Sequence, residues 1–232
     1  MIKDRIKKYI KAAFRIFGYN IIRIPKISVV QDQLSQDSQN AFNALYEQIR
    51  EHTVVSKNRC FMLYQLLKYA GHLVGDMAEV GVYKGGTAKL IAKTVPHKNV
   101  YLFDVFSGMP QTCKEIDMHK EKDFNDVSLG SVKSFLRNCP NVNIYHGIFP
   151  ETASPIKDKN FSFVYIDADL YKSVKDCLEF FYARMIRGGV IVLDDYGSCA
   201  CPGVKKAVSE FLVGKKEYPI ITTEIQCAII KL

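Results

Sequence analysis

The stretch Glu79–Thr87, EVGVYKGGT, places three glycines between a short apolar segment and an amphipathic one. The apolar segment Met77–Val82 is typical of a buried strand, and the pattern after the glycines predicts a helix near 86–95. A glycine-rich turn from strand to helix lets a cofactor approach the backbone closely. Glycines also occur where a tight turn needs a positive φ, so both interpretations stay open for the turn alone.

Strands and helices alternate from residue 76 to the end of the chain. The predicted strands are Met77–Val82, Val100–Asp104, Val142–His146, Phe161–Asp167, Val190–Asp194, Pro219–Thr222 and Ile225–Lys231. The predicted helices lie near 38–52, 56–70, 86–95, 128–138, 170–186 and 203–213. Alternation with short connections predicts an α/β fold with a mainly parallel sheet covered on both faces. The last two strands have no helix between them, so they predict a hairpin.

An acidic residue ends the second predicted strand. Asp104 closes VYLFD, about 20 residues after the glycines, where nucleotide-binding α/β folds place an acid that accepts hydrogen bonds from ribose hydroxyls. A helix cap or a solvated strand end is the alternative interpretation. Together with the glycine turn, Asp104 favours an adenosine-containing cofactor, without separating NAD from S-adenosylmethionine.

Four aspartates follow two other apolar strands. Asp167 and Asp169 come after FSFVYI, and Asp194 and Asp195 come after GGVIVL. Parallel central strands bring their carboxyl ends to one edge of the sheet, where open α/β sheets bind ligands. Carboxylates gathered there repel one another, and a hard, oxygen-preferring cation such as Mg²⁺ or Mn²⁺ relieves that repulsion. The alternative is that single members of the set cap helices.

These residues resemble the macrocin O-methyltransferase family. The matching segments are EVGVYKGGTA at Glu79–Ala88, LFDVFSGMP at Leu102–Pro110, FVYIDADLY at Phe163–Tyr171, RGGVIVLDDY at Arg187–Tyr196 and PGVKKAVSEF at Pro202–Phe211. The resemblance covers about residues 56–232. It implies a Rossmann-like class I methyltransferase fold, with a seven-stranded, mainly parallel sheet that ends in a β-hairpin, preceded by N-terminal helices.

The resemblance also implies roles for individual residues. The cofactor, S-adenosyl-L-methionine, would be held by Glu79, Gly81, Tyr83, Gly85, Gly86, Thr87, Asp104, Ser107 and Asp167. Mg²⁺ or Mn²⁺ would be bound by Asp167, Asp194 and Asp195, and Asp169 would be the general base. His119, His146 and Lys172 are alternative bases. The chain departs from the family after Asp104, where it has VFSG in place of the more usual SFEG.

The expected activity is methylation of a sugar hydroxyl on a glycan, a glycolipid or a glycosylated natural product. A catechol-type phenolic O-methyltransferase is one alternative, although that pattern has Asp-Asn where this chain has Asp194-Asp195. A non-catalytic glycan-cluster partner that retains the fold is another. A dinucleotide oxidoreductase is disfavoured because the stricter glycine fingerprint is absent.

The formal net charge of +8 is concentrated at the N-terminus. Residues 1–26 hold eight Lys/Arg and one acid, whereas the remaining chain holds 24 basic and 23 acidic residues. This distribution argues against a nucleic-acid-binding protein. The segment 2–17 predicts a basic amphipathic helix that would contact a membrane surface or a neighbouring subunit. We therefore expect residues 1–37 to form a helix and linker, 38–232 the methyltransferase domain, and the protein to be a homo-oligomer.

Seven cysteines form no paired spacing and no zinc-binding pattern. We expect these thiols to be reduced, and the sequence has neither a signal-peptide pattern nor 18 consecutive apolar residues. These features predict a cytoplasmic protein, with the inner face of the membrane as a second candidate location. The loop 105–127 is long for a compact domain, and loops of that length are usually lids, binding loops or mobile.

Overall fold

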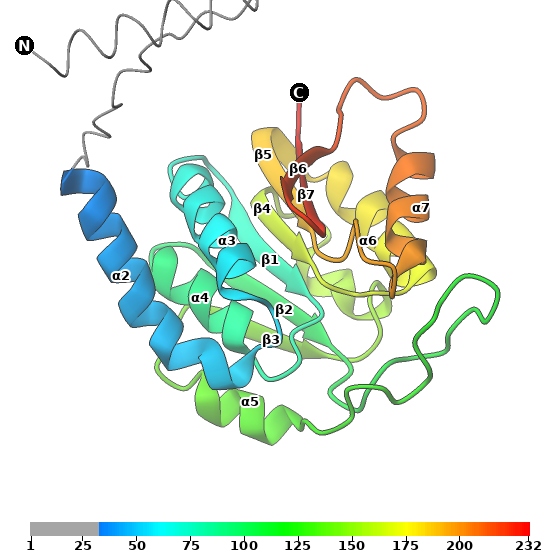
Figure 1. Cartoon of the computed structure of the whole chain (residues 1–232), viewed down its shortest axis with the longest axis horizontal. Coiled ribbons are helices and arrows are strands. Elements are labelled where there is room, and N and C mark those ends of the chain that lie inside the picture. The colour runs from blue at the N-terminus through cyan, green and yellow to red at the C-terminus, as the bar shows by residue number, and fades with distance from the viewer. Residues whose placement is uncertain (1–32) are drawn as a thin grey trace, which may run out of the picture. The chain divides into compact units, whose positions relative to one another are not determined.

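Seven strands form one sheet in the order β3-β2-β1-β4-β5-β7-β6 in a computed structural model that describes residues 33–232, with side chains from Gln36 (Figure 1). The strands are β1 Asp76–Val80, β2 Val100–Asp104, β3 Val142–His146, β4 Phe161–Ile166, β5 Met185–Leu193, β6 Ile220–Thr223 and β7 Gln226–Ile230. β1 to β5 run parallel, and β7 pairs antiparallel with both β5 and β6. The predicted α/β fold with its C-terminal hairpin is confirmed.

Helices cover both faces of this sheet. They are α2 Gln33–Ile49, α3 Lys57–Ala70, α4 Gly86–Thr94, α5 Leu129–Phe135, α6 Tyr171–Tyr182 and α7 Pro202–Phe211, with short 3₁₀ helices η1 Arg50–His52 and η2 Glu151–Ile156. Residues of α2 to α5 pack with one set of strand side chains, and residues of η2, α6 and α7 pack with the alternate set. Because successive strand residues point to opposite faces, every central strand is buried on both sides.

Two helix boundaries differ from the predicted ones by four residues or more. α6 ends at Tyr182 instead of 186, because β5 already begins at Met185, which pairs with Phe161 of β4. Backbone pairing with a central strand outweighs the helical pattern of a few apolar residues. α2 begins at Gln33, inside the segment expected to be a polar linker, and no glycine or proline interrupts residues 33–38.

The predicted amphipathic helix over 2–17 lies outside the described residues, so its membrane and subunit interpretations stay predictions. Among residues 33–232, no helix is both long enough and apolar enough to cross a bilayer.

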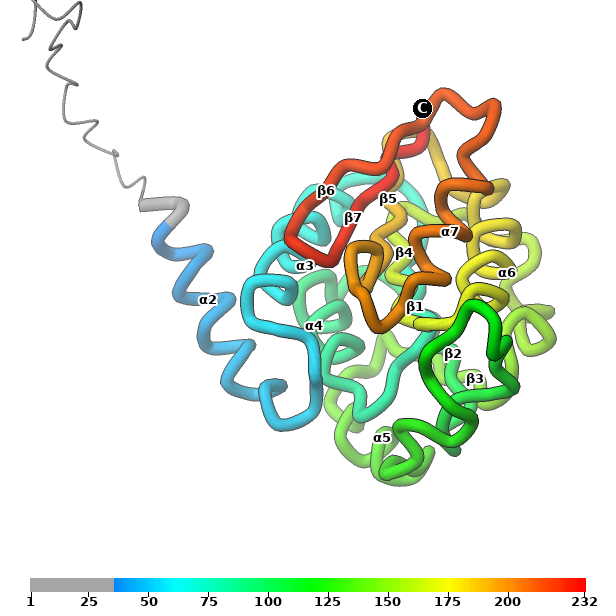
Figure 2. Tube along the Cα trace, turned by 45° about the vertical axis from the view of Figure 1, so that its right-hand side comes forward, coloured from blue at the N-terminus to red at the C-terminus, as the bar shows by residue number. Residues whose placement is uncertain are grey.

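The long loop 105–127 is held against the carboxyl edge of the sheet (Figure 2, green). Inside the loop, the backbone N–H of Met109 donates to the carbonyl of Asp123 at 2.9 Å, and the N–H of Lys122 donates back to Met109 at 3.0 Å. Asp117 accepts a hydrogen bond from the backbone N–H of Tyr171 at 2.9 Å and so caps the first turn of α6. The loop is therefore positioned by specific contacts with the core.

The junction of β1 and β4 provides a stability test. Gly81 has φ +88°, and a Cβ there would lie 1.8 Å from the carbonyl oxygen of Asp167. We expect Gly81→Ala to lower the free energy of unfolding by about 2–4 kcal/mol, because backbone strain and a clash with main chain act together. Urea denaturation measures the change.

Gly214 supplies the matched control, since it also has positive φ (+75°) but no atom within 4 Å of the added Cβ. Gly214→Ala should cost only the backbone strain, about 1 kcal/mol. Equal losses in the two variants would contradict the close approach of β1 to β4 at Gly81.

Candidate functional site

The glycine turn after β1 is organised by Asp104. One carboxylate oxygen of Asp104 accepts hydrogen bonds from the backbone N–H groups of Val82 at 2.6 Å and Tyr83 at 2.9 Å. The other oxygen accepts from the backbone N–H of Phe106 at 2.7 Å. A carboxylate has about four acceptor positions, so one remains for a ligand. Asp104 therefore holds the glycine turn instead of capping a helix or ending a solvated strand, and its role in ligand binding stays a prediction.

Two of the turn glycines are explained by backbone conformation and packing. A Cβ on Gly85 would contact Val132 and Phe135 of the α5 region, and a Cβ on Gly86 would lie 2.6 Å from the carbonyl oxygen of His52. Neither glycine lines the cavity at this edge. Gly85 also has φ +87°, a left-handed conformation that favours glycine, and Gly86 lets α4 pack closely against η1. The expectation that they contact the cofactor therefore receives no support from their placement.

Ser107, expected to bind the cofactor, is exposed and lies outside the cavity lining. After Asp104 the backbone turns at Phe106, which has φ 46°. The Phe106 side chain is buried, whereas Ser107 faces solvent. Ser107 is thus the predicted residue that the structure separates most clearly from the others.

Glu79 is fully buried beneath the turn. Thr87, on the first turn of α4, donates a hydrogen bond to one oxygen of Glu79 at 2.5 Å, while the other oxygen has no partner. Burial raises the pKa of Glu79 to about 8. Glu79 does not line the cavity, but Thr87 does, so the pair links the cavity wall to the core.

A cavity of about 330 Å³ opens at the carboxyl ends of the strands. The strand order reverses between β1 and β4, and such switch points are where α/β sheets bind ligands. Of the predicted residues, those that line the cavity are Gly81, Tyr83, Thr87, Asp104, Asp167, Asp169 and Asp195. Val105, Ile148 and Phe149 add apolar surface beside Asp104, and this combination of an acid with apolar walls fits a nucleoside.

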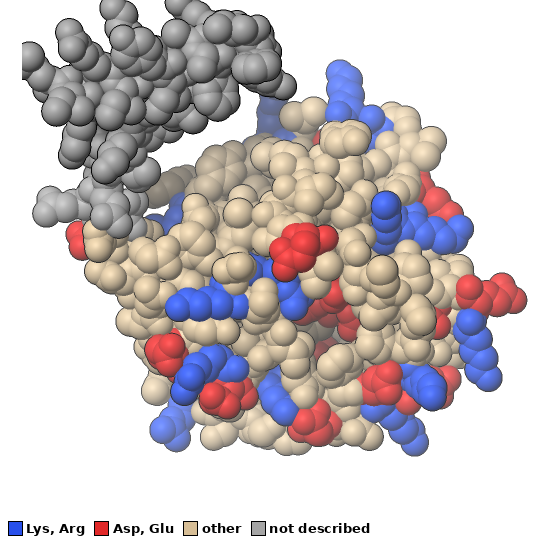
Figure 3. Space-filling model, in the orientation of Figure 1, with Lys and Arg blue, Asp and Glu red and all other residues tan. Residues whose placement is uncertain are grey.

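Acidic side chains gather at the wall of this hollow (Figure 3, red near the centre). Asp167, Asp194 and Asp195 each place a carboxylate oxygen within 4.8 Å of the others. Burial, followed by repulsion from Asp194, raises the pKa of both Asp167 and Asp195. Three oxygen ligands whose charges destabilise one another fit a hard divalent cation.

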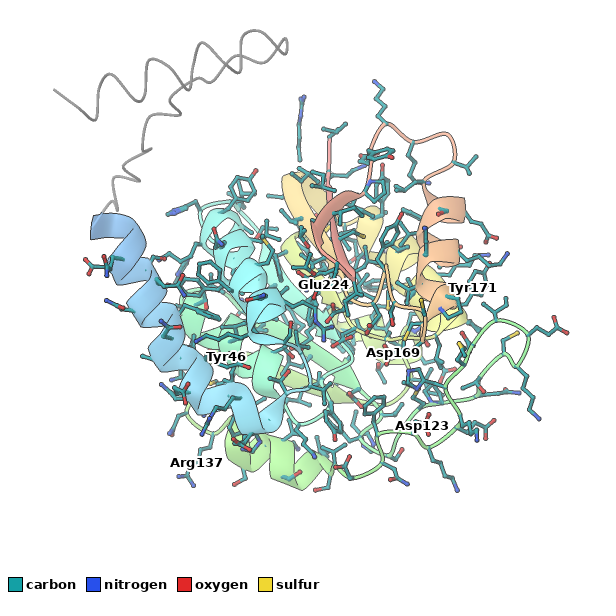
Figure 4. The ribbon with its side chains drawn as sticks, in the orientation of Figure 1. Tyr46, Asp123, Arg137, Asp169, Tyr171 and Glu224 are labelled. Carbon is teal, nitrogen blue, oxygen red and sulfur yellow. The ribbon has the colours of Figure 1, made fainter. Side chains whose placement is uncertain are left out.

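Asp169 stands beside this group and is labelled in Figure 4. Burial, reinforced by the charge of Asp195, raises the pKa of Asp169 to about 7. Both Asp169 and Asp195 have φ 55°, a left-handed conformation that costs non-glycine residues free energy and is concentrated at functional sites. A carboxyl group with a pKa near 7 is suited to accepting a proton.

Two residues that the sequence did not indicate hold Asp194. The guanidinium of Arg59, on α3, donates to Asp194 at 2.7 Å, and the hydroxyl of Tyr165, on β4, donates to the same oxygen at 2.6 Å. The Asp194 side chain is fully buried and that of Arg59 is 12% exposed. Arg59 is 135 positions away in sequence, and no local pattern signals such a contact.

The loop adds further residues to the site. Asp126 accepts hydrogen bonds from the Tyr83 hydroxyl at 2.7 Å and from the Lys84 ammonium at 2.6 Å, which fastens the loop to the glycine turn. Among the alternative bases, His119 lines the cavity, whereas His146 contacts the carbonyl of Val105 and does not.

Lys172, the third alternative base, pairs with Asp176 on the exposed surface of α6 and lies outside the cavity lining. The structure therefore brings Asp169 and His119 to the cavity and leaves His146 and Lys172 away from it.

Curated relatives match most of the chain. Over 178 residues the chain is 27% identical to the demethyldecarbamoylnovobiocin O-methyltransferase of Streptomyces niveus, which covers 69% of this chain and 67% of the relative. Over 180 residues it is 28% identical to the mycinamicin III 3''-O-methyltransferase of Micromonospora griseorubida, covering 69% and 70%. A tetracenomycin-C derivative 4'-O-methyltransferase of Streptomyces olivaceus is 28% identical, covering 65% and 64%. The matches span about two thirds of the relatives' length.

Solved structures share the fold. The O-methyltransferase NovP superposes with a TM-score of 0.74 at 20% identity, covering 84% of this chain and 99% of that one. The calicheamicin methyltransferase CalS11 superposes with a TM-score of 0.63 at 16% identity, covering 91% and 98%.

The family model described as macrocin-O-methyltransferase (TylF) matches residues 23–230, which is most of the chain. The protein therefore belongs to the macrocin O-methyltransferase family and is an S-adenosylmethionine-dependent O-methyltransferase.

Proposed function

We propose that the enzyme methylates a hydroxyl of a sugar unit, with Mg²⁺ or Mn²⁺ bound by Asp167, Asp194 and Asp195. The observation that carries the proposal is the convergence of these carboxylates beside the cavity. The relatives' names support the sugar, since one names a rhamnosyl group and its 4'-O position. The acceptor would be a small glycosylated molecule or a glycan-lipid.

The cofactor would lie at the β1–β4 switch point. S-adenosylmethionine supplies a methyl group made electrophilic by its sulfonium. Asp104, with one acceptor position left, would accept from the ribose, and Val105, Ile148 and Phe149 would enclose the base. Thr87, at the cavity wall, adds a polar group.

The metal ligands would orient the acceptor. A divalent cation at Asp167, Asp194 and Asp195 would supply Lewis-acid polarisation, which lowers the pKa of a hydroxyl. Arg59 and Tyr165 hold one oxygen of Asp194, and the other oxygen has only a 3.5 Å contact from Gln226. That second oxygen is the one available to a cation.

Asp169 would accept the hydroxyl proton as the acceptor oxygen attacks the methyl carbon. It does not belong to the set of three metal ligands, so it is free for proton transfer. Its pKa of about 7 keeps it able both to take up a proton and to release it near neutral pH.

The acceptor class is tested by methyl transfer from radiolabelled S-adenosylmethionine to a panel of glycosides, nucleotide sugars and glycan-lipids, with catechols in a parallel arm. Transfer to sugars and not to catechols supports the proposal. Transfer confined to catechols would assign the catechol-type alternative instead.

Replacement of the base should separate chemistry from binding. We expect Asp169→Asn to reduce kcat by about 10²–10⁴-fold, because an amide cannot accept the proton. The affinity for S-adenosylmethionine, measured by calorimetry, should stay nearly unchanged. Asp176→Asn, at a partly buried position of α6 outside the cavity lining, is the control and should retain its rate. A wild-type rate in Asp169→Asn would refute the base assignment.

Removal of metal should stop turnover and leave cofactor binding intact. After dialysis against EDTA we expect methyl transfer to fall to background and to return when Mg²⁺ or Mn²⁺ is added. The physical reason is that an unpolarised sugar hydroxyl is a weak acid and a poor nucleophile. Undiminished activity after dialysis would remove the metal from the mechanism.

The Arg59–Asp194 pair gives a test of the ligand set. Arg59→Met leaves a buried carboxylate without its cation and should destabilise the metal-free protein by about 3–5 kcal/mol. A divalent cation would replace the lost charge, so Mg²⁺ should raise the Tm of the variant more than that of the wild type.

The exposed Arg187 is the control, and Arg187→Met should leave both the Tm and its response to Mg²⁺ unchanged. If Mg²⁺ raises the Tm of Arg59→Met no more than that of the wild type, Asp194 does not belong to the ligand set.

A further inference from the structure

A second group of metal-binding side chains lies next to the carboxylates and shares no residue with them. His119, Asp169 and Cys201 each place one ligand atom within 4.8 Å of the others. They come from three separate segments: the long loop, the end of β4 and the residue that precedes α7. The group therefore exists only in the folded protein.

The donor atoms differ in kind from those of the first group. A nitrogen, an oxygen and a sulfur suit a borderline-soft ion such as Zn²⁺, whereas three carboxylates suit Mg²⁺. The Sγ of Cys201 lies 3.6 Å from Oδ1 of Asp169. Bonds of about 2.3 Å to sulfur and about 2.0 Å to oxygen, at a tetrahedral angle, place two ligands about 3.5 Å apart. The Sγ of Cys201 and Oδ1 of Asp169 therefore already have the spacing of two ligands of one ion.

His119 is oriented as a ligand by a neighbouring carboxylate. Its Nδ1 lies 3.2 Å from Oδ2 of Asp123, which leaves Nε2 as the nitrogen free to coordinate. Metal-binding histidines almost always have such a partner, which fixes the tautomer and the ring orientation. Asp117 anchors the same loop at the start of α6, so His119 is held near Asp169 by the fold. Figure 4 labels Asp123 and Asp169 in this region.

We propose that His119, Asp169 and Cys201 form a binding site for Zn²⁺-class ions, and that occupancy of this site inhibits methyl transfer. Binding would form one bond each to nitrogen, oxygen and sulfur and release the Cys201 thiol proton to solvent. The inhibitory part rests on the proposed function, since an ion bound to Asp169 takes the base away from the acceptor hydroxyl. The binding part is independent of it.

Co²⁺ is the probe for binding, because a cobalt–thiolate bond gives a charge-transfer absorption that oxygen ligands do not give. The reduced full-length protein, saturated with Mg²⁺, is titrated with Co²⁺. We expect one equivalent of the thiolate band, its loss in Cys201→Ser, and at least tenfold weaker binding in His119→Gln. Cys199→Ser is the matched control, since Cys199 is exposed and lies outside the group.

Three results would overturn the site. They are the absence of the thiolate band in the wild type, its persistence in Cys201→Ser and its loss in Cys199→Ser. If Cys201→Ser folds poorly, His119→Gln still tests the site, because it changes a side chain of the loop. Cobalt binding that is unchanged in His119→Gln would then overturn the site.

Inhibition is measured with Zn²⁺ in excess Mg²⁺. The zinc concentration for half inhibition, measured in each protein relative to its own rate without zinc, should rise at least tenfold in Cys201→Ser. Full activity at saturating Zn²⁺ would overturn the inhibitory part and contradict the role of Asp169, while the cobalt band reports on the site separately.

Discussion

Electrostatic repulsion among carboxylates at one sheet edge is the constraint on which the site depends. Asp167, Asp169, Asp194 and Asp195 follow two neighbouring parallel strands, so the fold cannot separate them. Burial, followed by the charges of the neighbouring carboxylates, raises the pKa of Asp167, Asp169 and Asp195. Arg59, on α3, offsets the charge of Asp194. The remaining excess explains why this edge suits cations and a proton acceptor at once.

The backbone that positions these groups depends on a close approach between β1 and β4. Gly81 meets the carbonyl of Asp167 where no Cβ fits. Asp104 then accepts two hydrogen bonds from the turn that follows β1 and a third from Phe106 in its own loop. The strand ends, the turn and the cavity form one unit, because the same residues that shape the turn also line the cavity wall.

The glycines and acids of the sequence each had a structural and a ligand-binding interpretation. The structure favours the structural interpretation for some of them and leaves the ligand-binding one open for others. Gly85 supplies the left-handed residue before α4, Gly86 allows close helix packing, and Asp104 holds the turn while keeping a free acceptor position. Ser107 faces solvent. The four aspartates behave as a set, as expected from the shared direction of their strands. Spacing therefore predicted which sheet edge carries these residues better than it predicted which atom of each residue is available.

Local sequence was enough to predict the order of strands and helices, the parallel sheet with its hairpin and the gathering of Asp167, Asp169, Asp194 and Asp195. These features follow from local periodicity and from the rule that parallel strands end at one edge. The pairing of Arg59 with Asp194 and the meeting of His119 and Cys201 at Asp169 could be seen only in the folded protein. Such contacts join segments far apart in the chain, and a side chain's partner across that distance depends on packing, which no local pattern encodes.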